Sequence, residues 1–231
     1  MISASEDRTL KVWDLETGAE LRTLPGHSLA AKAVAVTPDG RRAVSAGEHP
    51  GSTGELKVWD LRTEPRPRNV GAHTQAVSAV VVTPDGRHAV SASDDQTLKV
   101  WSLAQGAQLH ALTGHTDSVR ALAATPDGRR VISGSRDRTL KVWDVASGTQ
   151  LHTLAGHSRE VRAVAMTADG RRAISTSEEM TLKVWDVDTG AELHTLFGHS
   201  RGVKCVAMAP DCRRALSASA DGTVKVWDLD T

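Results

Sequence analysis

The sequence predicts an all-β fold built from one four-stranded antiparallel unit that repeats about six times. The six tryptophans of the 231-residue chain recur at spacings of 46, 42, 42, 42 and 42 residues, at Trp13, Trp59, Trp101, Trp143, Trp185 and Trp227. Short apolar runs alternate with Asp-Gly and Ser/Thr-Gly turns, which is the pattern of β-hairpins. No segment keeps the 3.6-residue period of an amphipathic helix.

The repeated unit is clearest from residue 114 onward, where it reads GHTDSVRALAATPDGRRVISGSRDRTLKVWD. We expect four strands from this unit and the residues that follow it, at 118–125, 130–135, 139–145 and 150–154. A fixed period of about 40 to 45 residues indicates an array of supersecondary units. A sheet of four short strands cannot bury both of its faces alone, whereas sheets stacked radially bury each other. The sequence therefore predicts a β-propeller of about six blades, as a single domain over residues 1–231.

The two ends of the chain fall inside the repeat. With the strands of a blade named a to d from the centre outward, the chain begins in strand b of blade 1 and stops after strand c of blade 6. The prediction is therefore 22 strands, with the inner strand of blade 1 and the outer strand of blade 6 missing and the ring incomplete at the termini. Met1 aligns with Val131, in mid-strand, so we hypothesise a piece of a longer protein or a misassigned gene start. Open strand edges also favour self-association.

The Gly-His opening, the Asp-Gly turn, the Ser-x-Ser-x-Asp element and the Trp-Asp close resemble the WD-repeat β-propeller family over essentially the whole chain. The close likeness among the repeats resembles the propellers of bacterial multidomain signalling proteins. The resemblance implies a non-enzymatic scaffold for protein–protein interaction. The alternative is a C-terminal sensor or regulatory propeller from a larger bacterial signalling protein, a kinase or a nucleotide-switch ATPase.

The resemblance also implies a hydrogen-bonded chain of four side chains in each blade, ending on the indole N–H. The matching residues are His73, Ser91, Asp95 and Trp101 in blade 3, His115, Ser133, Asp137 and Trp143 in blade 4, and His199, Ser217, Asp221 and Trp227 in blade 6. Ser, His and Asp together also suggest a nucleophilic triad. The set repeats in several blades and ends on an indole donor, so we expect a buried, structural role. Buried polar groups need partners, which explains why all four residues occur together.

Some repeats depart from this pattern. Glu179 stands where blade 5 should have the Asp, and blade 2 has no Asp in its turn but a four-residue insertion within 47–54. Cys212 replaces the turn glycine of blade 6. We predict weaker internal bracing in blades 2 and 5.

The resemblance implies that a partner binds on the face formed by the d–a and b–c loops. The fifth residue after the repeat His is basic in four of five blades, at Lys32, Ser78, Arg120, Arg162 and Lys204. The residues before the turn acid are Glu6, Asp94, Arg136, Glu178 and Ala220. These positions suggest docking of an acidic or phosphorylated peptide. The alternative is that the basic residues pair with acids of the same face.

Composition disfavours several other classes of function. The chain has 28 basic and 28 acidic residues, so it lacks the overall field that gathers nucleic acid or anionic membranes. Arginine pairs on the other face lie beside acids and lack stacking aromatics, which argues against a nucleic-acid surface. No apolar run approaches the roughly 20 residues of a membrane span. Only two cysteines and no Cys/His cluster or phosphate loop occur, so we expect a cytoplasmic protein with no cofactor, metal or catalytic residue.

Overall fold

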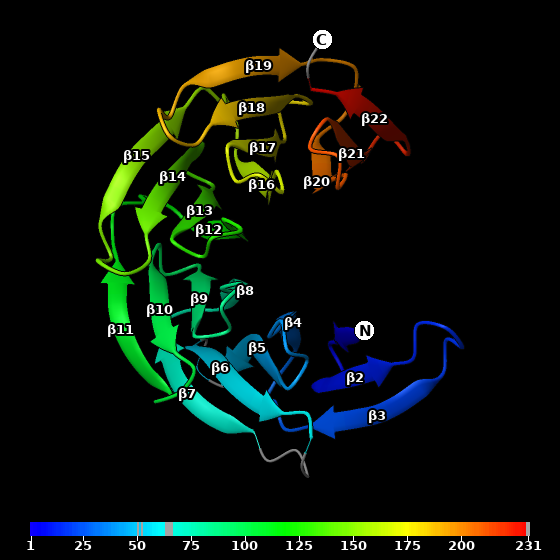
Figure 1. Cartoon of the computed structure of the whole chain (residues 1–231), viewed down its shortest axis with the longest axis vertical. Helices are drawn as coiled ribbons and strands as arrows, with labels where there is room; N and C mark the ends of the chain where they lie inside the picture. The colour runs from blue at the N-terminus through cyan, green and yellow to red at the C-terminus, as the bar shows by residue number, and fades with distance from the viewer. Residues whose placement is uncertain (50, 52, 63–66, 230–231) are drawn as a thin grey trace. The chain divides into compact units, whose positions relative to one another are not determined.

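The strands of every repeat pair in chain order into an antiparallel sheet (Figure 1). The computed structural model describes residues 1–49, 51, 53–62 and 67–229, and in these ranges 22 strands form six sheets, numbered here as blades 1 to 6. Four blades have four strands, and the first and last have three. This confirms the predicted all-β fold of propeller blades. Within the same ranges, no helix is long and apolar enough to cross a membrane.

The chain divides into two compact units, residues 1–111 and 112–231, and each is described by itself. The single domain over 1–231 stays a prediction. The strands of the first unit are β1 (Ile2–Ala4), β2 (Thr9–Trp13) and β3 (Glu20–Pro25) in blade 1; β4 (Ala31–Val36), β5 (Arg42–His49), β6 (Thr53–Asp60) and β7 (Arg68–His73) in blade 2; and β8 (Val77–Val82), β9 (His88–Ser93), β10 (Leu98–Ser102) and β11 (Ala107–Leu112) in blade 3. The insertion of blade 2 lengthens the β5–β6 hairpin.

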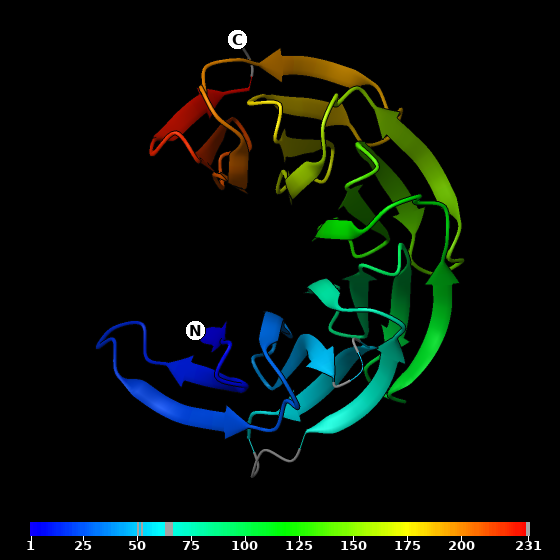
Figure 2. The ribbon, with the colours of Figure 1, turned by 180° about the vertical axis from the view of Figure 1, so that it is seen from behind.

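The second unit holds three further blades, and Figure 2 shows its strands from behind. Its strands are β12 (Val119–Ala124), β13 (Arg130–Ser135), β14 (Thr139–Asp144) and β15 (Gln150–Ala155) in blade 4; β16 (Val161–Met166), β17 (Arg172–Ser177), β18 (Leu182–Asp186) and β19 (Glu192–Leu196) in blade 5; and β20 (Val203–Met208), β21 (Arg214–Ser219) and β22 (Val224–Asp228) in blade 6.

The first turn of a blade is held by its own short sequence. In blade 4 the Thr125 hydroxyl donates to the Asp127 carboxylate, which also accepts the Arg129 amide at 3.0 Å. Gly128 closes the turn at φ 69°, in the left-handed region that glycine adopts without strain. In blade 6 this position is Cys212 at φ 59°. A side chain in that region costs about 1–2 kcal/mol, so the missing glycine makes this turn strained.

The core lies between successive blades, where the tryptophan of one blade packs against the blade before it. Trp185 of blade 5 belongs to a buried cluster with Ile132, Leu140 and Leu154 of blade 4. A Cβ added at Gly156 would lie 3.1 Å from the edge of that indole. The glycine of the Gly-His pair therefore leaves room for the next tryptophan.

Candidate functional site

The four polar residues expected in each blade form a continuous hydrogen-bonded chain. In blade 4, His115 Nδ1 lies 2.7 Å from Asp137 Oδ2 and its Nε2 lies 2.8 Å from Ser133 Oγ. The Trp143 indole N–H donates to the same Ser133 oxygen at 2.8 Å. Thr139 also donates its hydroxyl to Asp137, at 2.7 Å. The chain links the d–a loop to strands β13 and β14.

Blades 3 and 6 repeat this geometry. His73 lies 2.9 Å from Asp95 and 2.8 Å from Ser91, and Trp101 donates to Ser91 at 2.9 Å. The corresponding residues of blade 6 are His199, Ser217, Asp221 and Trp227, with distances of 2.7 to 2.8 Å. The structure therefore brings together all three of the predicted sets.

Glutamates complete the chain in blades 2 and 5. Glu179 bonds to His157, as its place in the sequence suggests. In blade 2, Glu55 lies 3.0 Å from His27, and that histidine lies 2.6 Å from Ser45. Glu55 was not predicted from the sequence, because it lies on strand β6 and not in the turn that carries the acid of the other blades. A complete set in blade 2 removes the reason for expecting weaker bracing there.

The carboxylates of these sets are held in their charged form. Burial alone would raise the pKa of Asp137, but its hydrogen bonds with His115 and Thr139 outweigh burial and hold the pKa well below its usual range. Burial alone would also raise the pKa of Glu179, but hydrogen bonds from Ser158 and His157 outweigh burial and lower the pKa to about 2. Burial lowers the pKa of His157, so this histidine is neutral near pH 7.

The serine of blade 5 lies in a Ser–His–Glu arrangement, but it is closed off from solvent. With His157 neutral and its Nδ1–H donating to Glu179, its Nε2 accepts the Ser175 proton at 2.7 Å. The Ser175 oxygen accepts the Trp185 indole N–H at 2.8 Å, and the serine is fully buried. A substrate could not reach this hydroxyl in the folded blade, as expected for a set that braces the sheet. No group of three or more His, Cys, Asp or Glu suited to a metal occurs within the described ranges.

The predicted basic positions share a backbone feature that the sequence did not reveal. In the first strand of blades 2 to 6, the pairing register skips the second residue of the strand, which forms a β-bulge there. The skipped residues are the five positions singled out above, Lys32, Ser78, Arg120, Arg162 and Lys204. A bulge re-aims a side chain and is common beside functional sites.

In the second unit, the loop face carries a chain of ion pairs across three blades. Arg136 of blade 4 lies 3.0 Å from Glu160, which also pairs with Arg162 of blade 5. Arg162 lies 2.7 Å from Glu178, which pairs in turn with Lys204 of blade 6. The hydrogen bond from Lys204, followed by the charge of Arg162, holds the pKa of Glu178 below its usual value. The structure thus brings four of the predicted binding residues together.

In the first unit, two contacts between corresponding residues each lie within a single blade. Lys32 lies 2.5 Å from Glu48, and the Ser78 hydroxyl donates to Asp94 at 3.1 Å. Glu6 is exposed to solvent. The loop face of this unit therefore offers less concentrated positive charge than that of the second unit.

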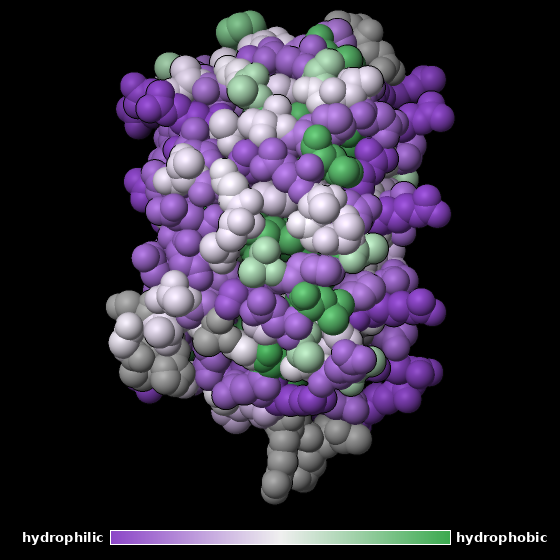
Figure 3. Space-filling view, turned by 90° about the vertical axis from the view of Figure 1, so that its left-hand side faces the viewer, coloured by the Kyte–Doolittle hydropathy of each residue, from purple (hydrophilic) through white to green (hydrophobic). Residues whose placement is uncertain are grey.

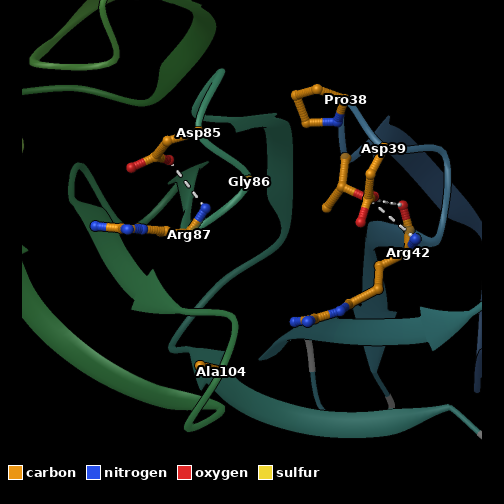
Figure 4. Close-up of a pocket in the computed structure, with 8 residues that line it drawn as sticks. Pro38, Asp39, Arg42, Asp85, Gly86, Arg87 and Ala104 are labelled. Atoms are coloured by element: carbon orange, nitrogen blue, oxygen red, sulfur yellow. Dashed lines mark hydrogen bonds between the residues drawn. The ribbon is translucent and has the colours of Figure 1, made fainter.

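Arginines on the opposite face connect neighbouring blades. Arg42 donates to the Leu103 carbonyl at 3.0 Å and borders a pocket of about 360 Å³ between blades 2 and 3 (Figure 4). The acids beside it, Asp39 and Asp85, accept main-chain amides of their own turns. In the second unit, Arg130 donates to the Val187 carbonyl at 3.3 Å in the same way. This role could not be predicted from a single repeat, because the partners lie about 60 residues away in the sequence.

Comparison with known proteins supports the architecture. A stretch of 48 residues, 21% of this chain, is 46% identical to a nuclear distribution protein PAC1 of Arthroderma otae and 48% identical to that of Arthroderma benhamiae. It is 44% identical to the nuclear distribution protein PAC1-2 of Uncinocarpus reesii. The match spans only 10% of the length of each relative, and these fungal proteins give no support to a bacterial type.

The family model described as WD domain, G-beta repeat matches six segments, which include every tryptophan of the repeat. The matched residues are 1–14, 18–60, 66–102, 106–144, 148–186 and 190–228. The chain therefore belongs to the WD-domain, G-beta repeat family.

Proposed function

We propose that this protein is a non-enzymatic interaction scaffold that binds an acidic or phosphorylated segment of a partner on the loop face of its second unit. WD repeats indicate a protein–protein interaction scaffold in general. The relatives named nuclear distribution protein are compatible with such a role. The partner class proposed here rests on the charges of this chain.

The observation that carries the proposal is the ion-pair chain from Arg136 to Lys204. Its three cations, Arg136, Arg162 and Lys204, share only two acids. The cations are one third to one half exposed, and an exposed ion pair is worth only about 0–1 kcal/mol. A carboxylate or phosphate of a partner can therefore replace these pairs at low cost, with charge-assisted hydrogen bonds to arginine.

The residues around the ion pairs favour modest affinity for a partner. Tight interfaces concentrate their energy on aromatic and arginine anchors. Phe197, in the loop before β20, is 75% exposed and is an aromatic residue near this face. On the side of the molecule that Figure 3 shows, apolar side chains form separate spots among polar ones, without the large apolar patch of a tight interface.

A charge-reversal experiment tests the proposal. Fluorescein-labelled phosphoserine and Asp/Glu-rich peptides are titrated against the wild type and an Arg162→Glu/Lys204→Glu variant. We expect the variant to lose about tenfold or more in affinity, since each replaced cation becomes a repulsive charge. The control is Arg129→Glu/Arg171→Glu, which makes the same charge change at exposed positions of the opposite face. Equal loss in both variants, or no loss in either, would refute the proposal.

The alternative proposal, a regulatory propeller from a larger bacterial signalling protein, receives no support from the fungal relatives. Neither the ion-pair chain nor the structural polar sets favours it over the scaffold.

A further inference from the structure

Two pockets on the face opposite the loop face occupy the same place in the repeat. One lies between blades 2 and 3 of the first unit, with a volume of about 360 Å³, and the other lies between blades 4 and 5 of the second unit, with a volume of about 480 Å³. Each is lined by eight residues, and seven positions carry the same residue type in both. The exception is the turn before the fourth strand, which supplies Ala104 to the first pocket and Asp188 to the second.

In the second unit, this turn gives Arg130 two partners. The Nη1 atom of Arg130 donates to the Val187 carbonyl at 3.3 Å, and its Nη2 atom lies 2.7 Å from Asp188 Oδ1. Asp188 follows Val187 directly in the chain, so one turn supplies both the carbonyl and the carboxylate to one guanidinium. A carboxylate is therefore the group that complements this arginine in its pocket.

In the first unit, Arg42 keeps the carbonyl partner but lacks the carboxylate. Its Nη1 atom donates to the Leu103 carbonyl at 3.0 Å, and Ala104 follows where the second unit has Asp188. Among the residues that the structure describes, no carboxylate forms an ion pair with Arg42. Figure 4 shows that Arg42 extends from blade 2 toward Ala104, whereas Arg87 extends away from Arg42. Arg42 is therefore the cation that a ligand beside Ala104 would meet.

The other acids of the linings do not account for this difference, because they occur in both pockets. Asp39 and Asp85 of the first pocket correspond to Asp127 and Asp169 of the second. In the first pocket, the Oδ1 atom of each acid accepts a threonine hydroxyl and a main-chain amide of its own turn. Each lining has two arginines, so the first is neutral and the second carries one net negative charge, from Asp188. A ligand carboxylate would give the first pocket the charge of the second.

A second arginine reaches the same turn from the outer strand of blade 2. A neighbouring pocket of about 510 Å³ shares Arg42 and Ala104 with the first and is also lined by Arg68. The Nη2 atom of Arg68 donates to the Gln105 carbonyl at 2.5 Å, so the two arginines bind carbonyls on either side of Ala104. Asp60, which also lines this pocket, accepts an amide of its own turn. Two guanidinium groups held by carbonyls therefore flank Ala104.

We propose that the surface at Ala104 binds a small dicarboxylic acid. One carboxylate takes the place that Asp188 fills in the second unit and pairs with Arg42, and the other pairs with Arg68. Guanidinium groups match carboxylates through paired, charge-assisted hydrogen bonds. The volumes of both pockets lie in the range of about 300–1,000 Å³ that is usual for small-ligand sites. The site shares no residue with the ion-pair chain of the second unit, so either proposal can fail without the other.

Nuclear magnetic resonance of the isotopically labelled full chain tests the proposal, with the Nε–H signals of the arginine side chains as the readout. Sodium succinate is added at constant ionic strength. We expect a saturable shift at Arg42 with a dissociation constant of about 1–10 mM, as suits two partly exposed charge pairs. Ala104→Asp supplies an internal carboxylate, as Asp188 does, and should weaken succinate binding about tenfold or more.

Two controls accompany this variant. Ala104→Asn has the size of Ala104→Asp without the charge, and it should weaken succinate binding far less. Ala104 is exposed, so neither substitution disturbs the core. Arg162→Glu/Lys204→Glu, which alters the loop face of the second unit, should bind succinate as the wild type does.

The reciprocal variant creates the site in the second unit. Asp188→Ala removes the internal carboxylate, and we expect a succinate-dependent shift at Arg130 that the wild type lacks. No response at Arg130 would contradict the equivalence of the ligand and the Asp188 carboxylate. The proposal is overturned by the absence of a saturable shift at Arg42, by equal binding to Ala104→Asp, or by tighter binding of inorganic phosphate than of succinate.

Discussion

Blades 5 and 6 have similar sequences but differ sharply in how much of each sequence is buried. Leu182 and Val184 of β18 are fully buried, packed in one cluster with Val203 and Ala215 of blade 6. Their counterparts on β22, Val224 and Val226, are 67% and 63% exposed. The indole-to-serine bond is nevertheless 2.8 Å long in both blades. Within this unit, the polar set forms in each blade, whereas burial requires a neighbouring sheet and an outer strand.

The difference shows which stabilising terms are local. A hydrogen-bonded set forms wherever the four residues occur, because they lie on adjoining strands and loops of one blade. Apolar burial is worth about 1.5–3 kcal/mol for each fully buried large side chain, and it depends on the adjacent elements. The same residue at two blades should therefore differ in its contribution to stability.

Replacement of the tryptophans should show the largest difference. Trp185→Ala removes a fully buried indole and leaves Ser175 without its donor, and we expect a loss of about 3–5 kcal/mol in the free energy of unfolding. Trp227→Ala should cost clearly less, because that indole is partly exposed. Urea unfolding followed by far-UV circular dichroism measures both. Equal losses would show that the outer strand adds nothing to the cover of the indole.

The paired aliphatic positions sharpen the comparison. Leu182→Ala should lower the free energy of unfolding by about 2–5 kcal/mol, since it empties a site inside a packed cluster. Val224→Ala should change it by less than about 0.5 kcal/mol, as expected for an exposed position. The same unfolding experiment measures both. A loss above 1.4 kcal/mol for Val224→Ala, about tenfold in the equilibrium constant, would mean that β22 is buried in solution.

Acidification should weaken blade 5 in two steps. The pKa of His157 is lowered from 6.5 by burial, so the unfolded chain takes up this proton first and stability falls as the pH drops below about 6.5. The pKa of Glu179 is about 2 in the folded protein and 4.5 in the unfolded chain, so its contribution is complete above pH 4.5 and is lost as the pH falls toward 2. Thermal unfolding from pH 7 to pH 3 measures the combined loss.

The variant Glu179→Gln isolates the second step. It should be less stable than the wild type at pH 7, and the difference should narrow below pH 4.5, because glutamine has no proton to gain there. Asp137→Asn makes the same change in blade 4, where the acid of the polar set is the usual aspartate. Parallel curves for the wild type and Glu179→Gln at low pH would contradict the bond between Glu179 and His157.

Relief of the strained turn in blade 6 should give the smallest effect. Cys212→Gly places glycine at a φ of 59° and should raise the free energy of unfolding by about 1 kcal/mol. Gly170→Ala, at the equivalent turn of blade 5 with φ 73°, should lower it by a similar amount. Differential scanning calorimetry detects both shifts. A less stable Cys212→Gly protein would show that the side chain makes contacts that outweigh the strain.

The strands could be predicted closely, because their signals are local. The strand predicted at 130–135 matches β13. The strand predicted at 118–125 is one residue longer than β12 at each end, and the other two differ from β14 and β15 by one residue at the C-terminal end. Turn glycines indicate where the backbone adopts a positive φ, and the tryptophan indicates the third strand of each blade. Most of the polar set could be predicted for the same reason.

What the sequence did not predict depends on register or on distant partners. Glu55 was missed because the inserted hairpin moves the acid from the turn to a strand. The bulges at Arg162 and its counterparts depend on pairing with the next strand, which residue types do not show. The ion pairs of Glu178 and the bond from Arg42 to Leu103 join different blades, so a repeat read by itself does not contain them.

Amide hydrogen exchange at Val184 and Val226 tests the contrast between these blades most directly. By strand alternation both amides point to the outer edge, where β19 lies beside β18. We predict slow exchange at Val184 and exchange at Val226 close to that of an unprotected amide, under conditions in which the chain stays folded. Equally slow exchange at both positions would contradict the account, because it would mean that the edge of β22 is already covered.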